Sequence, residues 1–177
     1  FFFRNKGGEI MEQEHLCQCC RPININCLSG ITGPTGPTGP SGGLANQSFA
    51  SFANYATIFT NNAPMNLYQD VADITGNITP LNTTTIQLQP GFYQIQYSVS
   101  ALLTNPGYIQ ITPSYNGASH IEFGIYANIN TARSSAWGSQ SIIIEVPTTT
   151  TFTLTFSSNT THTEGQLTLT ILKLERS

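Results

Sequence analysis

The sequence contains few charged residues. Charged side chains make up 8% of the 177 residues, with six Lys and Arg against nine Asp and Glu, whereas about a quarter is usual for soluble proteins. A nucleic-acid-binding surface needs clustered Lys and Arg to neutralise phosphates, so no nucleic-acid partner is expected. Hydrophobic residues nevertheless make up 39% of the chain, which is enough to build a sizeable core.

Long hydrophobic runs are also missing. No apolar segment approaches the roughly 18 residues of a membrane span, so no membrane partner is expected. The start of the chain lacks the basic region, apolar run and small-residue cleavage site of a secretory signal. If the protein becomes extracellular, it does so without the ordinary secretory route, and assembly inside a mother cell followed by release on lysis is one such way.

The first ten residues allow two interpretations. Residues 6–11 read Lys-Gly-Gly-Glu-Ile-Met, which a purine-rich ribosome-binding site followed by a start codon can encode. This favours Met11 as the biological start and residues 1–10 as a translated leader. Alternatively, the leading aromatic residues form an apolar plug on a glycine hinge and insert into a neighbouring subunit. The residues of that plug are Phe1, Phe2 and Phe3.

No combination of residues in the sequence is typical of an enzyme. His15 lies in the N-terminal segment, and His120 and His162 lie in polar, loop-like sequence, so all three are expected to be solvated. Asp70 and Asp73 are close enough in sequence to share a cation, although a solvated loop is the favoured interpretation. The sequence therefore predicts no enzyme, no cofactor and no metal site.

A strict glycine repeat occupies residues 30–44. Five consecutive Gly-X-Y triplets place glycine at Gly30, Gly33, Gly36, Gly39 and Gly42. Three polyproline II strands that wind together leave room only for glycine on their common axis. The repeat therefore predicts a collagen-like stalk over residues 29–44 and a homotrimer. The alternative is a Pro/Gly-rich hinge that happens to be periodic.

Residues 45–177 alternate with the period of β-strands. Apolar and polar residues alternate over 93–99, 152–156 and 167–171. The continuous run Ile142–Ile144 predicts a strand that is buried on both faces. Turn signals separate these runs, at Gln89-Pro90-Gly91, Asn105-Pro106-Gly107, Asn116-Gly117, Pro147 and Glu164-Gly165. The pattern predicts an all-β sandwich or jelly roll.

All the cysteines lie in one short N-terminal segment: Cys17, Cys19, Cys20 and Cys27. In an extended chain, neighbouring Cys19 and Cys20 point in different directions, so a single partner within the chain cannot easily serve both. Bridges to other chains are the favoured interpretation. Two alternatives stay open, a thiolate metal site that includes His15 and an unstructured reactive tail.

Three features in a fixed order carry a resemblance to a known family. Phe52-Ala53-Asn54 follows the glycine repeat, residues 89–95 read Gln-Pro-Gly-Phe-Tyr-Gln-Ile, and the chain closes on an alternating strand over 167–174. Together they resemble the collagen-like glycoprotein family (BclA-type) of bacterial spore exosporia. The resemblance covers residues 30–177 and implies that residues 45–177 form a trimeric jelly roll of the tumour-necrosis-factor and complement type. The short stalk and the cysteine-rich start depart from this family.

Residues 1–28 resemble the N-terminal connectors of endospore appendage subunits, through Leu16, the Cys19-Cys20 pair and the spaced Cys27. This resemblance implies a connector that enters a neighbouring subunit and is cross-linked there. The docking candidates are Phe1, Phe2, Phe3, Leu16, Ile23 and Ile25. The spore-glycoprotein resemblance also implies glycosylation, for which the candidates are the Y-position residues Thr32, Thr35 and Thr38. The Asn-X-Ser/Thr sequons at Asn46, Asn77, Asn82 and Asn159 are close to the number expected by chance.

These features together predict a structural protein of the bacterial spore surface, in an exosporium nap or an endospore appendage fibre. The expected trimer interface consists of the strand aromatics with Leu172 and Leu174. The alternative is a trimeric adhesin head that binds a host glycan or protein. An exposed aromatic patch would favour adhesion, and its candidate members are Tyr108, Tyr115, Tyr126 and Trp137.

Overall fold

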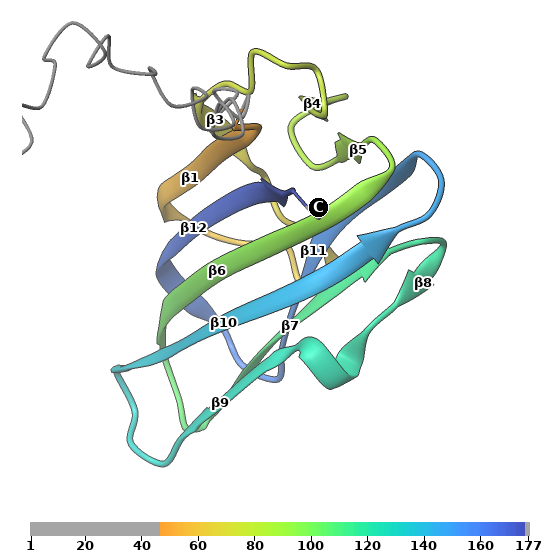
Figure 1. Ribbon diagram of the computed structural model, residues 1–177. Coiled ribbons are helices and arrows are strands. Elements are labelled where there is room, and N and C mark those ends of the chain that lie inside the picture. The colour runs from red at the N-terminus through yellow and green to blue at the C-terminus, as the bar shows by residue number, and fades with distance from the viewer. Residues whose placement is uncertain (1–46, 176–177) are drawn as a thin grey trace, which may run out of the picture. The chain divides into compact units, whose positions relative to one another are not determined.

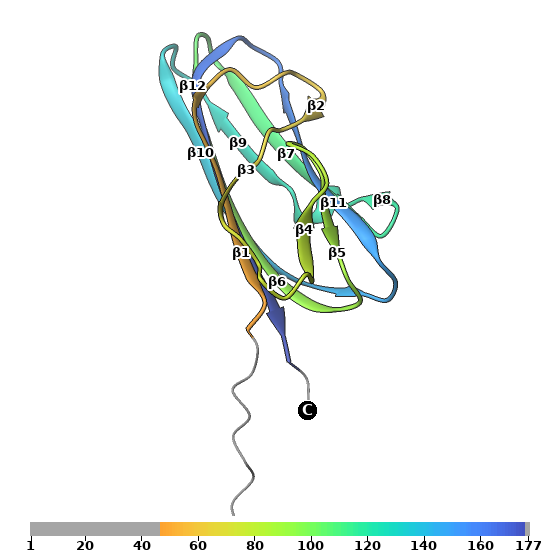
Figure 2. The ribbon, with the colours of Figure 1, turned by 90° about the horizontal axis from the view of Figure 1, so that it is seen from above.

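The computed structural model describes residues 47–175, which form two layers of antiparallel β-sheet (Figures 1 and 2). The front sheet has the strand order β10 (Ser134–Val146), β6 (Gly91–Leu103), β12 (His162–Leu174), β1 (Phe49–Thr57) and β3 (Tyr68–Val71). The back sheet has the order β4 (Ile78–Pro80), β5 (Ile86–Leu88), β11 (Thr150–Ser158), β7 (Gly107–Tyr115) and β8 (Ala118–Ser119). In addition, β2 (Ala63–Pro64) pairs with β11, β9 (Ile125–Ile129) pairs with β7, and a short 3-10 helix, η2, spans Ile121–Phe123.

The core lies between the two sheets and follows directly from period-two alternation. In β6, Tyr93, Ile95 and Tyr97 point inward and are fully buried, whereas the residues between them face outward. In β11, Phe152 and Phe156 do the same from the back sheet. The prediction of an all-β sandwich from this alternation is confirmed.

The prediction for the isoleucine run is wrong. Ile142 and Ile144 are buried, but Ile143 is 67% exposed. The reason is that β10 keeps strict alternation, so Ile143 faces outward from the front sheet, where no described residue covers it. The continuous apolar run predicted that both faces of this strand would be buried, whereas the described domain buries only one of them.

One predicted turn is also wrong. Glu164 and Gly165 lie inside β12, where they form a bulge that shifts the register from Thr163↔Leu102 to Gln166↔Ser100. Glu164 has a positive φ of 52°, a left-handed conformation that is common where extra residues are inserted into a strand. The other predicted turns do fall between strands.

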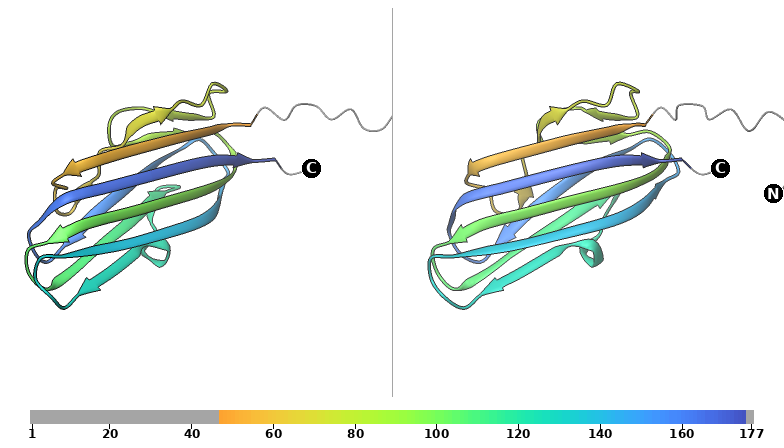
Figure 3. Two further views of the ribbon diagram at one scale, coloured as in Figure 1. Left: turned by 90° about the vertical axis from the view of Figure 1, so that its left-hand side faces the viewer. Right: turned by 60° about the vertical axis from the view of Figure 1, so that its left-hand side comes forward.

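Both described ends of the chain lie at the same end of the sandwich, which we call the proximal end (Figure 3). Phe49 at the start of β1 is opposite Leu172 near the end of β12, and the Lys173 amide donates to the Ser48 carbonyl at 2.8 Å. The opposite, distal end consists of the loops β1–β2, β6–β7, β9–β10 and β11–β12. The described chain therefore presents one end to whatever precedes residue 47 and leaves the distal end free of its termini.

Candidate functional site

Most site residues predicted from the sequence lie outside the described residues. These are the disulfide candidates Cys17, Cys19, Cys20 and Cys27, the repeat glycines Gly30, Gly33, Gly36, Gly39 and Gly42, the glycosylation candidates Thr32, Thr35 and Thr38, and the docking candidates Phe1, Phe2, Phe3, Leu16, Ile23 and Ile25. His15 and Asn46 also lie there. The described residues supply two other candidate sites, one on the front sheet and one at the distal end.

The first candidate site is the outward surface of the front sheet, the front face. Directly opposite residues on neighbouring strands share a face, so the register defines four rows across it. From the distal to the proximal end, the rows are Trp137–Ser100–Gln166, then Ser139–Ser98–Thr168–Ala53, then Ser141–Gln96–Thr170–Ser51, then Ile143–Gln94–Leu172–Phe49. None of the residues in these rows carries a charge.

The last row contains three large apolar residues and Gln94, and we call it the proximal row. Ile143, Leu172 and Phe49 are exposed by 67%, 38% and 42%. Burying such side chains in an interface is favourable by roughly 25 cal/mol per Å². Among the described residues, the front face carries more exposed large apolar side chains than the back face, where Tyr126 is the one on a strand.

The predicted interface residues are only partly available. Leu172 is exposed and Leu174 is half-buried. The strand aromatics Tyr93, Tyr97 and Phe156 are fully buried, so their assignment to an interface is wrong, because they alternate toward the core. The sequence reasoning missed Ile143, although the parity of β10 relative to Ile142 and Ile144 could have identified it.

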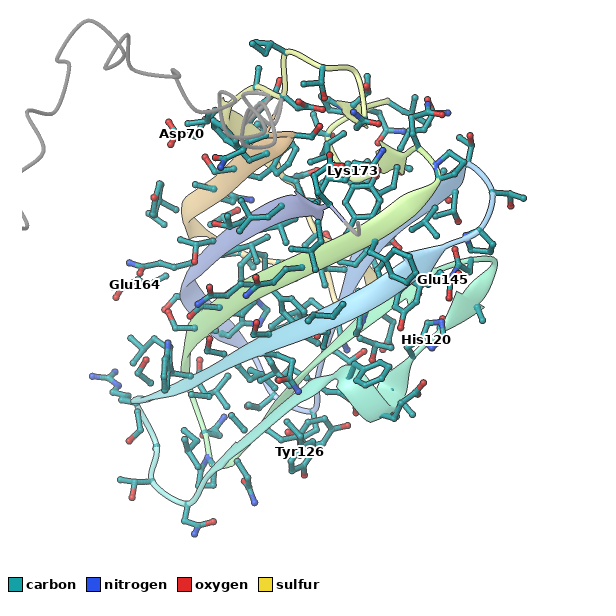
Figure 4. All side chains as sticks on the ribbon, in the orientation of Figure 1. Asp70, His120, Tyr126, Glu145, Glu164 and Lys173 are labelled. Carbon is teal, nitrogen blue, oxygen red and sulfur yellow. The ribbon has the colours of Figure 1, made fainter. Side chains whose placement is uncertain are left out.

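The four candidate aromatics of an adhesive patch do not gather. Tyr115 is buried beneath His120, with ring centroids 3.9 Å apart. Trp137 lies on the front face, where its indole donates to Ser98 Oγ at 3.1 Å. Tyr126 extends from β9 (Figure 4) and stacks on Tyr108 with centroids 5.2 Å apart. The patch is therefore split, and the Tyr108–Tyr126 pair is its largest piece.

The second candidate site is a distal cleft of about 680 Å³. Three asparagines from different loops border it: Asn61 after β1, Asn105 between β6 and β7, and Asn159 between β11 and β12. The other residues that line the cleft are Ile58, Ser158, Thr160, Thr161 and His162. The cleft is open to solvent rather than enclosed.

His162 contributes a buried wall to the cleft, so its prediction as a solvated side chain is wrong. It is 7% exposed, its ring packs 4.6 Å from that of Phe156, and Nε2 accepts a hydrogen bond from the Phe59 amide at 3.0 Å. The neutral ring therefore carries its proton on Nδ1. Burial lowers the pKa of His162, which keeps the ring neutral at pH 7.

His120 is not a free surface side chain either. Its Nδ1 lies 2.8 Å from Glu122 Oε1, and Nε2 lies 3.3 Å from the Tyr115 carbonyl oxygen. The stacking on Tyr115 fixes the ring plane. These contacts hold the His120 ring in place next to η2, so the residue has a local structural role.

Asp70 and Asp73 do not share a site. Asp70 accepts a long hydrogen bond of 3.5 Å from Ser51, whereas the Asp73 carboxylate accepts from the amides of Thr75, Asn77 and Ile78. Burial opposes ionisation of Asp73, yet these hydrogen bonds hold its pKa below the usual value. Within residues 47–175, no group of three His, Cys, Asp or Glu side chains is arranged to hold a metal.

The Asn77 side chain, which begins one of the sequons, is held in structural hydrogen bonds. Its Nδ2 donates to Ser48 Oγ and Thr75 Oγ1, and its Oδ1 accepts from Lys173 Nζ at 2.6 Å. Lys173 points from β12 toward the loops around β4 and β5 (Figure 4). Glycosylation of Nδ2 would break these contacts, so Asn77 serves to fasten the proximal loops.

No helix in the described part of the chain is long and apolar enough to span a membrane. No protein-family model matches the chain, and no curated protein matches its sequence.

Solved structures do match. The globular domain of zebrafish complement 1qA superposes with a TM-score of 0.55 at 10% identity, covering 73% of this chain and 99% of that one. Eiger TNF from S. frugiperda gives a TM-score of 0.52 at 10% identity, over 74% and 94% of the two chains. PRD1 vertex protein P5 gives 0.50 at 15% identity, over 72% and 97%. At such identities the likeness shows the fold alone, which is a jelly roll of the tumour-necrosis-factor and complement type.

Proposed function

We propose that the protein is a structural protein of the bacterial spore surface, and that it forms a collagen-like homotrimeric subunit of an exosporium nap or an endospore appendage fibre. The jelly roll is the trimeric head, residues 29–44 are the stalk, and residues 1–28 are the connector. The head's fold and the exposed proximal row support the trimer, and the resemblances of the sequence support the spore surface.

The single observation that carries the trimer is the position of the proximal row. A Gly-X-Y triple helix holds three chains on one axis. Gly42 and Gln47 are five residues apart in sequence, so they span at most about 17 Å. Under this proposal the three copies of β1 begin within reach of this short connection, and Phe49, at the start of β1, is a member of the proximal row.

The front face suits such an interface. Its rows combine apolar residues at the proximal end with Ser, Thr, Gln and Ala in the middle, so the rows themselves contain no charge to desolvate. The Asp70 carboxylate, which accepts from Ser51, lies at the β3 edge of this face. The stalk alone is too short to hold three chains, because each interchain hydrogen bond contributes only about 1 kcal/mol. The association energy of the trimer comes from the heads.

The connector then attaches each trimer to its neighbours. Cys17, Cys19, Cys20 and Cys27 lie outside the described residues, and the described domain contains no cysteine. Disulfides persist in an oxidising, extracellular setting, where interchain bridges resist conditions that dissolve packed interfaces. The stalk, if fully wound, extends about 45 Å at about 3 Å per residue and carries the head outward.

Immunogold electron microscopy of intact spores tests this location, with antibody raised against the full chain. The proposal expects gold on the surface nap or on appendages of unbroken spores. Its control is the same labelling on spores of a strain that lacks the gene. Labelling that requires broken spores, or that marks vegetative cells equally, would contradict the proposal.

A second candidate function, an adhesin head, is favoured by the distal cleft. The cleft lies at the end opposite both described chain ends and contains polar groups that the fold itself does not use. An attached trimer would present this end to its surroundings.

A further inference from the structure

We propose that the distal cleft binds a neutral saccharide through the side-chain amides of Asn61 and Asn159. This inference specifies the ligand class of the second candidate function. It does not depend on how the chains assemble, because the rows of the front face contain none of the residues that border the cleft.

The two asparagines are oriented by the fold. Asn61 Oδ1 accepts a hydrogen bond from the Ser158 amide at 2.8 Å, and Asn159 Oδ1 accepts from the Tyr108 amide at 2.9 Å. A backbone N–H can only donate, so these contacts fix which side-chain atom is oxygen and which is nitrogen. Within residues 47–175 neither Nδ2 donates a hydrogen bond, so each keeps two free N–H donors.

Donors held in place in this way suit a ligand that is rich in oxygen acceptors. Because the asparagine side chains are already fixed by their oxygens, a ligand does not have to immobilise them on binding. The hydroxyl and ring oxygens of a sugar are such acceptors. Asn105 and the hydroxyl of Thr160 border the same cleft and add further polar groups.

The cleft carries no charge. Its single titratable side chain among the described residues is His162, which is buried and neutral with Nε2 bonded to the Phe59 amide. Anionic and cationic ligands therefore find no counter-charge in the lining, whereas a neutral ligand avoids the cost of burying an unpaired charge. This distinguishes a neutral sugar from a uronic acid or a sugar with a free amino group.

Apolar surface lies beside these donors, as sugar rings require for their C–H faces. Ile58 is exposed on the cleft. Asn159 also connects the cleft to the stacked Tyr108–Tyr126 pair, through its hydrogen bond to the Tyr108 amide. Tyr126 is 64% exposed but is not part of the cleft's lining.

Saturation-transfer difference NMR on the full-length protein tests the proposal. The probes are the methyl glycosides of glucose, galactose, mannose and N-acetylglucosamine, with glucuronate and glucosamine as charged comparisons. Asn61→Asp and Asn159→Asp keep the acceptor oxygen for the backbone amides and remove the free donors. Asn82→Asp is the matched control, because Asn82 Oδ1 also accepts a backbone N–H, from Thr84, away from the cleft.

We expect at least one neutral glycoside to bind at millimolar concentration, and the charged sugars to bind less well. Each Asn→Asp change in the cleft weakens binding about fivefold, as expected for the loss of one net hydrogen bond, while Asn82→Asp leaves it unchanged. The proposal is overturned if no neutral glycoside binds, if the charged sugars bind best, or if both cleft variants bind like the unmodified protein. A trimer that binds no sugar would refute this inference and leave the structural function standing.

Discussion

Nε2 of His162 accepts a hydrogen bond from the backbone amide of Phe59 at 3.0 Å, between two segments that are 103 residues apart in sequence. The bond ties the first residues of the β1–β2 loop to the start of β12. Since Nε2 must be unprotonated to accept it, the integrity of the distal end depends on pH.

We predict that the domain loses stability as the pH falls through about 6.5, the ordinary value for the unfolded histidine. Burial lowers the pKa of His162 in the folded state, so the unfolded chain binds more protons below that pH and unfolding becomes easier. The loss continues until the pH falls below the lowered folded pKa. Calorimetric melting of the full chain at about pH 7.5 and 5.5 measures it.

The control for this prediction is His162→Gln, which can still accept from the Phe59 amide through its side-chain oxygen but does not titrate. We expect the difference in Tm between the two pH values to shrink in this variant. Asp73 does not confuse the comparison, because its pKa lies below the usual carboxylate value and its contribution is lost only at lower pH. An unchanged pH dependence in His162→Gln would assign the effect to other groups.

We predict that Gly165→Ala destabilises the head by about 1–3 kcal/mol, the range of overpacking in a filled core. A Cβ at this bulge would lie 2.5 Å from Cε2 of Phe59 and 2.8 Å from the Thr57 carbonyl oxygen. Denaturant unfolding measures the change. Thr151→Ala, which faces outward on the back sheet and lies outside the proposed interface, is the comparison and should alter stability by no more than about 0.5 kcal/mol. Equal effects of the two changes would show that the bulge has room for a side chain.

The period-two alternation of strands such as β6 and β11 was enough to predict the sandwich, because a strand's inward residues are set by parity alone. The same parity places Ile143 on the outward face of the sheet, which the described domain does not cover. Interpreting the isoleucine run as a strand buried on both faces ignored this parity. His162 and the bulge at Gly165 depend on contacts with Phe59, about a hundred residues away in sequence. Long-range contacts of this kind leave no local signal, so neither feature could be predicted.

The cysteines lead to a separate prediction, which concerns residues 1–28. On denaturing gels, native protein should run as high multimers without reductant and near 19 kDa with it. Cys19→Ser combined with Cys20→Ser should remove most of that ladder. Four free thiols and a monomer band without reductant would refute the cross-linked connector and favour the metal-site or flexible-tail alternatives.

The central claim is that three heads associate through the front face, and sedimentation equilibrium of the full chain under reducing conditions tests it most directly. We predict a mass of three times 19.2 kDa for the unmodified protein and for Thr151→Lys on the exposed back face. The double variant Ile143→Lys/Leu172→Lys should sediment near 19.2 kDa with unchanged circular dichroism, because it places charges in the proximal row. A monomeric unmodified protein, or a double variant that remains trimeric, would contradict the account.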